Sequence, residues 1–95
     1  MSALESANKI KVKFGDLISE PTEFRGEITL KLAAAEKIFD VCQYAKRSLG
    51  FDYLVDICSV DNYGEDPRWT VIYHLRGVAS GQELRVKTEV SEEKS

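Results

Sequence analysis

Three strand-like runs follow one another in the C-terminal half of this 95-residue chain, with little between them except turns. Residues 51–60 and 69–75 are the first two runs, and an acidic segment with glycine and proline, residues 62–67, joins them. The third run, residues 84–90, alternates apolar and charged side chains after a turn at residues 80–82. Turns of this composition join strands into hairpins. We therefore expect a mixed or antiparallel sheet to dominate this half of the fold.

Two segments of the N-terminal half have apolar residues at helical spacing and end at a glycine, which adopts the left-handed conformation that terminates helices. The first segment begins with a capping box from Ser2 to Glu5 and ends before Gly15. The second ends before Gly50. Their apolar stripes are Ala3, Ala7, Ile10 and Phe14 in the first helix, and Ile38, Val41, Cys42, Ala45 and Leu49 in the second.

Two further strands are expected between these helices. Residues 17–20 precede Pro21, and we interpret them as an edge strand because proline cannot donate to a sheet ladder. After a turn at residues 25–27, Ile28, Leu30 and Leu32 alternate with polar neighbours, which indicates a half-buried strand. The order α-β-β-α-β-β-β predicts an α+β, two-layer sandwich with both helices on one face of the sheet. Residues 1–95 then form a single domain.

Charge and hydropathy argue against several classes of partner. The formal net charge is -3 and the sequence has no basic block, so nucleic acid is not an expected partner. No run approaches the about 20 apolar residues that a membrane-spanning helix needs. The N-terminus lacks the apolar core of a signal peptide. We expect a soluble chain in a reducing compartment.

The sequence also lacks the patterns of a metal or cofactor site. Cys42 and Cys58 are the only cysteines, whereas an iron–sulfur cluster needs about four thiolates. Their spacing to each other and to His74 is not that of a zinc site, and we interpret Cys42 as a small core residue. The acidic turn at residues 61–66 has its glycine fourth, not sixth as in a calcium loop. No dinucleotide- or phosphate-binding glycine motif is present, so we expect no cofactor.

His74 is the only histidine, so any histidine-based acid–base catalysis must use it. Strand alternation places His74 on the more polar face together with Arg76, and we expect a surface histidine that faces solvent or a partner. The rival interpretation is an enzyme of unknown class built around His74, Cys58 and Asp56. Nothing in the spacing of these three residues requires them to meet.

The run at residues 53–60 has more apolar residues than a strand needs when helices cover only one face of its sheet. Strict alternation puts Tyr53, Val55 and Ile57 on one face, and Leu54, Cys58 and Val60 on the other, with Asp56 as the only polar interruption there. The uncovered face of a central strand normally carries more polar side chains than this run does. We therefore expect another chain to cover that face, which makes the protein one component of a larger assembly.

Six short segments of the sequence are typical of one known family: LGFDYL (49–54), SVD (59–61), DPR (66–68), VIYHL (71–75) and LRVK (84–87), with EFRGE (23–27) earlier in the chain. In these segments the sequence resembles the C subunit of NADH-quinone oxidoreductase, which is the thirty-kilodalton subunit of respiratory complex I. The resemblance covers nearly the whole chain, and the block from residue 49 to residue 90 is its specific part.

The resemblance implies a cofactor-free subunit, without catalytic groups of its own, in the hydrophilic arm of the complex on the cytoplasmic or matrix side. Its partners would be other complex I subunits, chiefly the large hydrogenase-like subunit that helps form the quinone cavity. Contact with the membrane would be indirect, through the complex. The family's Glu-Arg-Glu signature is absent from this sequence. We interpret the chain as the N-terminal domain of a longer subunit, ending before that signature.

The expected partner contacts are Asp61, Arg68, Trp69, His74 and Arg85. Asp61 and Arg68 flank the acidic turn, where a charge pair could instead fix its shape, and Arg85 could lie on a solvated strand face. Related subunits occur in membrane-bound hydrogenases, so such a complex is an alternative. A second alternative is a free-standing adaptor that binds peptides along a sheet edge, with residues 17–20 as the candidate edge.

Overall fold

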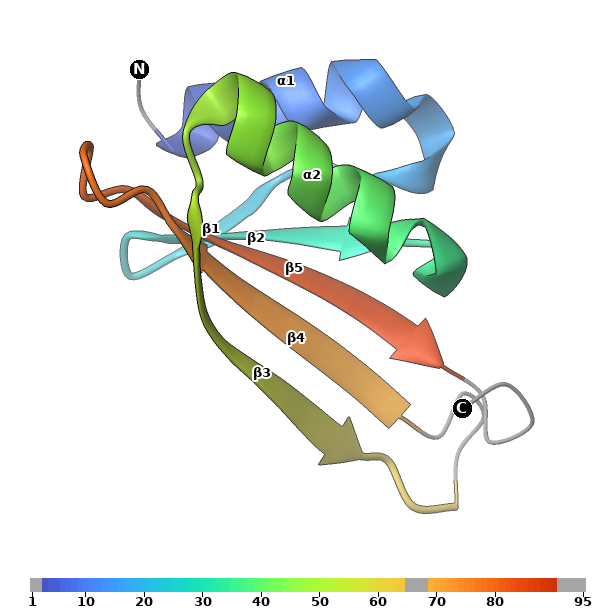
Figure 1. Ribbon diagram of the computed structural model, residues 1–95. Helices are drawn as coiled ribbons and strands as arrows, with labels where there is room; N and C mark the ends of the chain where they lie inside the picture. Colours follow the sequence, from blue (N-terminus) through green and yellow to red (C-terminus); the bar gives the residue numbers. More distant parts are fainter. Residues whose placement is uncertain (1–2, 65–68, 91–95) are drawn as a thin grey trace.

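The computed structural model describes residues 3–64 and 69–90, in which two α-helices pack on one face of a five-stranded sheet (Figure 1). This arrangement confirms the predicted α+β sandwich and the expected order of its main elements. The elements are α1 (Ala3–Phe14), the short 3₁₀ helix η1 (Gly15–Leu17), β1 (Thr22–Phe24), β2 (Glu27–Leu32), the short 3₁₀ helix η2 (Ala35–Lys37), α2 (Ile38–Leu49), β3 (Tyr53–Asp61), β4 (Trp69–Arg76) and β5 (Glu83–Val90).

Both helices form where the apolar stripes predicted them. Val41 and Ala45 of α2 are fully buried, and Gly50 ends the helix in the left-handed conformation with φ of 81°. The amide of Phe51 then donates to the carbonyl of Ala45 at 3.0 Å, which satisfies a carbonyl at the helix end. In α1 the fully buried apolar residues are Ala7 and Ile10. The predicted capping box includes Ser2, which lies outside the described residues.

The strands lie in the order β1-β2-β5-β4-β3, so the last strand of the chain occupies the centre of the sheet. β5 pairs in parallel with β2 and antiparallel with β4. Its inner face, the face on which the helices pack, carries the fully buried Leu84 and Val86. These two side chains meet Leu30 of β2 and the helical stripes in one core, which is the main source of stability.

The predicted edge strand at residues 17–20 is wrong in position. The chain first makes the 3₁₀ helix η1, and Ile18 pairs with Leu32 only as an isolated bridge. The amide of Lys31 donates to the Ser19 hydroxyl at 3.1 Å, so a side chain takes the place of a ladder carbonyl. Pro21 has no amide hydrogen to continue the ladder. The edge strand β1 therefore begins after it, at Thr22.

The turn after β4 packs against the end of α2. A Cβ atom added at Gly77 would lie 2.9 Å from the carbonyl oxygen of Gly50, so only glycine fits this approach. Asp52 strengthens the junction, because its Oδ1 accepts a hydrogen bond from the amide of Val78 at 3.1 Å. The start of β3 and the turn between β4 and β5 are thereby held together.

Candidate protein-docking surface

β3 is an edge strand that the helices leave uncovered. Figure 1 shows α1 and α2 over the part of the sheet that contains β1, β2 and β5, with β3 farthest from them. All nine residues of β3 are exposed. Its large apolar side chains, which are 38% to 55% exposed, are Tyr53, Leu54, Val55, Ile57 and Val60. The apolar excess of this segment therefore belongs to an edge strand and not to the central strand that the sequence suggested.

A β-bulge at Val55 changes which side chains share a face. Leu54 lies opposite Leu75 of β4, but Asp56 already lies opposite His74, so Val55 is the extra residue. Directly opposed residues point to the same side of a sheet. The strict alternation predicted for this strand is thus wrong on one side of the bulge. The inner face carries Leu54 and Ile57, and the outer face carries Tyr53, Asp56, Cys58 and Val60.

An open apolar hollow of about 410 Å³ lies on the inner face, at the far end of β3, β4 and β5. Its lining residues are Ser59, Trp69, Val71 and Val90. Trp69 lies opposite Asp61 on one side and opposite Val90 on the other. Two of the predicted partner-contact residues, Asp61 and Trp69, therefore meet at this end of the sheet. A partner that covered the hollow would bury apolar surface.

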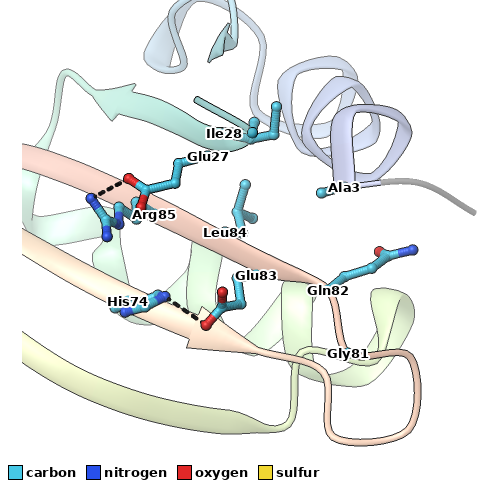
Figure 2. A pocket seen from close by; sticks show the side chains of 10 residues that line it. Ala3, Glu27, Ile28, His74, Gly81, Gln82, Glu83, Leu84 and Arg85 are labelled. Atoms are coloured by element: carbon cyan, nitrogen blue, oxygen red, sulfur yellow. Dashed lines mark ion pairs between the residues drawn. The ribbon is translucent and has the colours of Figure 1, made fainter. Parts of the chain in front are cut away.

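The other two predicted contact residues in the described part of the chain, His74 and Arg85, lie opposite each other on the outer face. Arg85 Nη1 is 2.7 Å from Glu27 Oε2, and His74 Nε2 is 3.3 Å from Glu83 Oε1. Figure 2 shows these two pairs beside a pocket of about 230 Å³. The His74 side chain lies on the outer face, where strand alternation placed it, and is only 18% exposed. Arg85 is thus ion-paired within the domain, and the His74 ring lies close to a carboxylate.

The structure brings together only part of the catalytic group considered from the sequence. His74 Nδ1 lies 3.9 Å from Asp56 Oδ1, but Cys58 lies opposite Ile72, further along the strand. Within residues 3–64 and 69–90, no group of three or more His, Cys, Asp or Glu side chains could hold a metal ion. Burial raises the pKa of the Cys42 thiol, which leaves less thiolate and fits a core role. In the same residues, no helix is long and apolar enough to cross a bilayer.

Arg68 lies outside the described residues, so its role as a partner contact, and the alternative of a charge pair with Asp61, stay predictions. Sequence reasoning missed Glu27 and Glu83 as the partners of Arg85 and His74. Glu83 alternates with Arg85 on β5, and that pattern could have placed it on the same face. Glu27 could not have been found in this way, because its position depends on the parallel pairing of β2 with β5.

Comparisons with known proteins match the part of the chain that carries the sequence resemblance. The family model described as "Respiratory-chain NADH dehydrogenase, 30 Kd subunit" matches residues 32–95. The C subunit of NADH-quinone oxidoreductase from Geotalea uraniireducens is 37% identical over 84 residues, which cover 88% of this chain and 51% of that protein. The same subunit from Geobacter sulfurreducens is 39% identical over 83 residues, covering 86% and 51%. The chain thus spans about half the length of these relatives.

Two solved structures have a similar fold. The trypsin-resistant fragment (1-134) of Nqo5 matches with a TM-score of 0.75 at 20% identity, over 94% of this chain and 70% of that chain. A chain of the membrane-bound sulfane sulfur reductase, an archaeal respiratory membrane complex, matches with a TM-score of 0.71 at 26% identity, over 90% and 48%. The matched block, the relatives and the fold agree: this chain belongs to the family of the 30 Kd subunit of respiratory-chain NADH dehydrogenase.

Proposed function

We propose that this chain is a cofactor-free, non-catalytic scaffold domain of a proton-translocating NADH:quinone oxidoreductase. In this role it lies in the peripheral arm on the cytoplasmic side and holds the large hydrogenase-like subunit that forms the quinone site. It meets the membrane only indirectly, through the complex. Family membership supports this proposal, as do the relatives that are named as the C subunit of NADH-quinone oxidoreductase.

The exposed strand β3 is the single observation that carries the scaffold role. A strand with five large apolar side chains exposed on two faces is an aggregation hazard unless a partner covers it. The apolar hollow beside Trp69 continues the same surface across β4 to β5. We therefore propose that the partner binds at this end of the sheet and contacts Asp61 and Trp69. Arg68, which precedes Trp69 in the sequence, stays a proposed contact on the basis of the sequence alone.

His74 and Arg85 have a second role in this proposal. The ion pair of Arg85 with Glu27 and the contact of His74 with Glu83 connect three neighbouring strands on the outer face, next to the proposed docking region. A partner that reaches the outer face meets polar side chains that already have partners within the domain. Shape complementarity therefore contributes more to binding there than charge attraction does. We keep both residues as proposed partner contacts on that basis.

The domain is, in this proposal, the N-terminal part of a longer subunit. The relatives are about twice as long as the matched region, which leaves a further segment of the subunit to reach deeper into the complex. A second candidate is the corresponding subunit of a membrane-bound hydrogenase or a related complex. The similarity to a chain of the archaeal sulfane sulfur reductase favours keeping it, because that complex is also respiratory and membrane-bound.

Co-purification of the longer subunit with the large hydrogenase-like subunit of the same organism tests the proposal. The expected result is one complex on size exclusion chromatography, with no NADH oxidation by the isolated subunit. Separate elution of the two proteins would contradict the scaffold role. Turnover by the isolated subunit that His74→Ala abolishes, with the fold intact, would instead support an enzyme.

A further inference from the structure

β3 has one edge that pairs with β4 and one edge that, within the described residues, pairs with nothing. About every second residue of such a strand points its amide and carbonyl groups away from the sheet. The opposite edge of the sheet is β1, which has only three residues. β3 has nine and is therefore the long unpaired ladder of this fold.

The side chains beside this ladder fit a strand better than they fit a helix. A strand that pairs with β3 places its own side chains alternately on the two faces of the extended sheet. On the inner face they would contact Ile57 and the hollow beside Trp69, and on the outer face Cys58 and Val60. A helix packed on one face would leave the apolar side chains of the other face exposed.

The charge of this edge indicates which strand fits. β3 carries two aspartates, Asp56 and Asp61, and no lysine or arginine. The Asp56 side chain is 66% exposed, although His74 Nδ1 lies 3.9 Å from its Oδ1. A second copy of the chain, paired antiparallel in registers centred on Asp56 or Ile57, would bring two Asp56 carboxylates opposite or diagonal to each other. Like charges at these positions destabilise a strand pair. The edge therefore favours a basic strand over a second copy.

The bulge at Val55 limits how much of β3 can pair in a regular ladder, since bulges are one way in which proteins protect sheet edges. Beyond it the register to β4 is continuous from Asp56 to Asp61. At the spacing of an antiparallel strand this segment is about 20 Å long. That length suits pairing with a strand of ordinary size.

We propose that an extended strand of a partner protein, apolar on both faces and carrying lysine or arginine, adds to the sheet along residues 56–61 of β3. The inference rests on the proposed function in one respect, because it identifies how the large hydrogenase-like subunit is held. The main-chain hydrogen bonds supply affinity, and the charge of Asp56 together with the apolar side chains supplies selectivity.

Residue-resolved amide hydrogen exchange of the isotope-labelled chain tests this directly. Alternate amides of β3 exchange fast in the free chain, because they point outward, and those bonded to β4 exchange slowly and act as an internal control. Two probes are added in turn: the purified large hydrogenase-like subunit, and a nine-residue Val/Thr/Lys strand peptide with a Val/Thr/Glu peptide as its matched control. We expect the fast β3 amides to slow by about tenfold or more with the large subunit and the lysine peptide.

The two probes separate the two proposals. Complex formation with the large subunit that leaves the fast β3 amides unchanged would overturn strand addition and leave the scaffold role intact. Failure of the large subunit to bind, with slowing by the lysine peptide alone, would overturn the scaffold role and support strand addition. Equal slowing by the glutamate peptide, slowing by neither probe, or protection that depends on the concentration of the free chain would each overturn the basic partner strand.

A pair of charge reversals completes the test. Asp56 has a side chain that is 66% exposed, so Asp56→Lys is compatible with the fold. It should weaken binding of the lysine peptide by roughly fivefold or more, because it places like charges side by side. Glu23→Lys makes the same change on the opposite edge strand, β1, and should leave that affinity unchanged. Equal weakening by both variants would show a general charge effect and overturn the assignment to β3.

Discussion

The hydroxyl of Thr88 in β5 donates a hydrogen bond to the carbonyl of Leu32 in β2 at 3.0 Å, in the buried layer between the sheet and the helices. Replacing Thr88 by Val keeps the shape of the side chain and removes the donor. We expect a loss of about 1 kcal/mol in the free energy of unfolding, measured by urea denaturation. Thr29→Val, the same change on the half-exposed outer face of β2, should stay within about 0.5 kcal/mol of the parent. Equal effects of the two changes would show that this hydrogen bond adds no stability.

Gly77→Ala should destabilise the fold by a steric effect on backbone atoms. The added Cβ would lie 2.9 Å from the carbonyl oxygen of Gly50 and 2.7 Å from Ser80 Oγ. The Ser80 side chain can rotate away, whereas the carbonyl belongs to the end of α2 and cannot. We expect a loss of about 1–3 kcal/mol in thermal or urea unfolding. The loss should persist in the double variant Gly77→Ala with Ser80→Ala, and its disappearance there would assign the clash to Ser80 alone.

The ion pair between Arg85 and Glu27 should contribute little to stability although its distance is only 2.7 Å. Both side chains are more than one third exposed, so water and salt screen their attraction. A double-mutant cycle with Arg85→Gln and Glu27→Gln should give a coupling energy of about 0.2–1 kcal/mol that falls as salt is added. A coupling that is insensitive to salt would mean that the pair is less exposed in solution than in the structure.

Ile57→Lys should weaken binding to the large hydrogenase-like subunit while the domain keeps its stability. Ile57 is 55% exposed on β3, so the change removes little buried area from the free chain. In the complex it would place a charge in an apolar contact, and we expect a loss of about 2 kcal/mol in binding by calorimetry. Val12→Lys on α1, where the parent side chain is 84% exposed, is the matched control. Equal binding by both variants would move the docking surface away from β3.

Thiol modification should distinguish the two cysteines. Burial raises the pKa of the Cys42 thiol, so at a given pH it supplies less thiolate, and iodoacetamide should label it more slowly than the exposed Cys58. In denaturant the two rates should become equal. Because the folded chain holds the Cys42 proton more tightly than the unfolded chain does, this group's contribution to stability is complete at low pH and declines above about pH 8.5. Equal labelling of the two native thiols would contradict the burial of Cys42.

The local parts of this fold could be predicted because their signals are local. The stripe from Ile38 to Leu49 and the stop at Gly50 depend on helical spacing and on one conformational preference, and both are present in the structure. The alternation of β5 likewise placed Leu84 and Val86 in the core. Each of these features is decided by neighbours within a few positions, so tertiary packing confirmed what the local pattern favoured.

The candidate site could be predicted only in part, because strand order is not a local property. β3 was expected to be central, but the pairing of β5 with β2 moves it to the edge. The bulge at Val55 then moves Tyr53 and Leu54 to the faces opposite to those that alternation assigned. Residues at opposite ends of the chain decide the strand order, and a single extra residue decides which faces Tyr53 and Leu54 occupy. The prediction that residues 53–60 are unusually apolar was therefore correct. The predicted central position of this strand, and the predicted faces of Tyr53 and Leu54, were wrong.

The central position of β5 has a consequence for how the chain is made. The contact between Thr88 and Leu32 closes a separation of 56 residues, so the core cannot form until the last strand is available. During synthesis from the N-terminus, β3 and β4 are made before β5. Until β5 is available, their apolar residues have no strand that connects them to β2 and to the core. A chain whose synthesis stops before Glu83 therefore lacks the strand that connects β4 to β2, and its sheet stays in two separate parts.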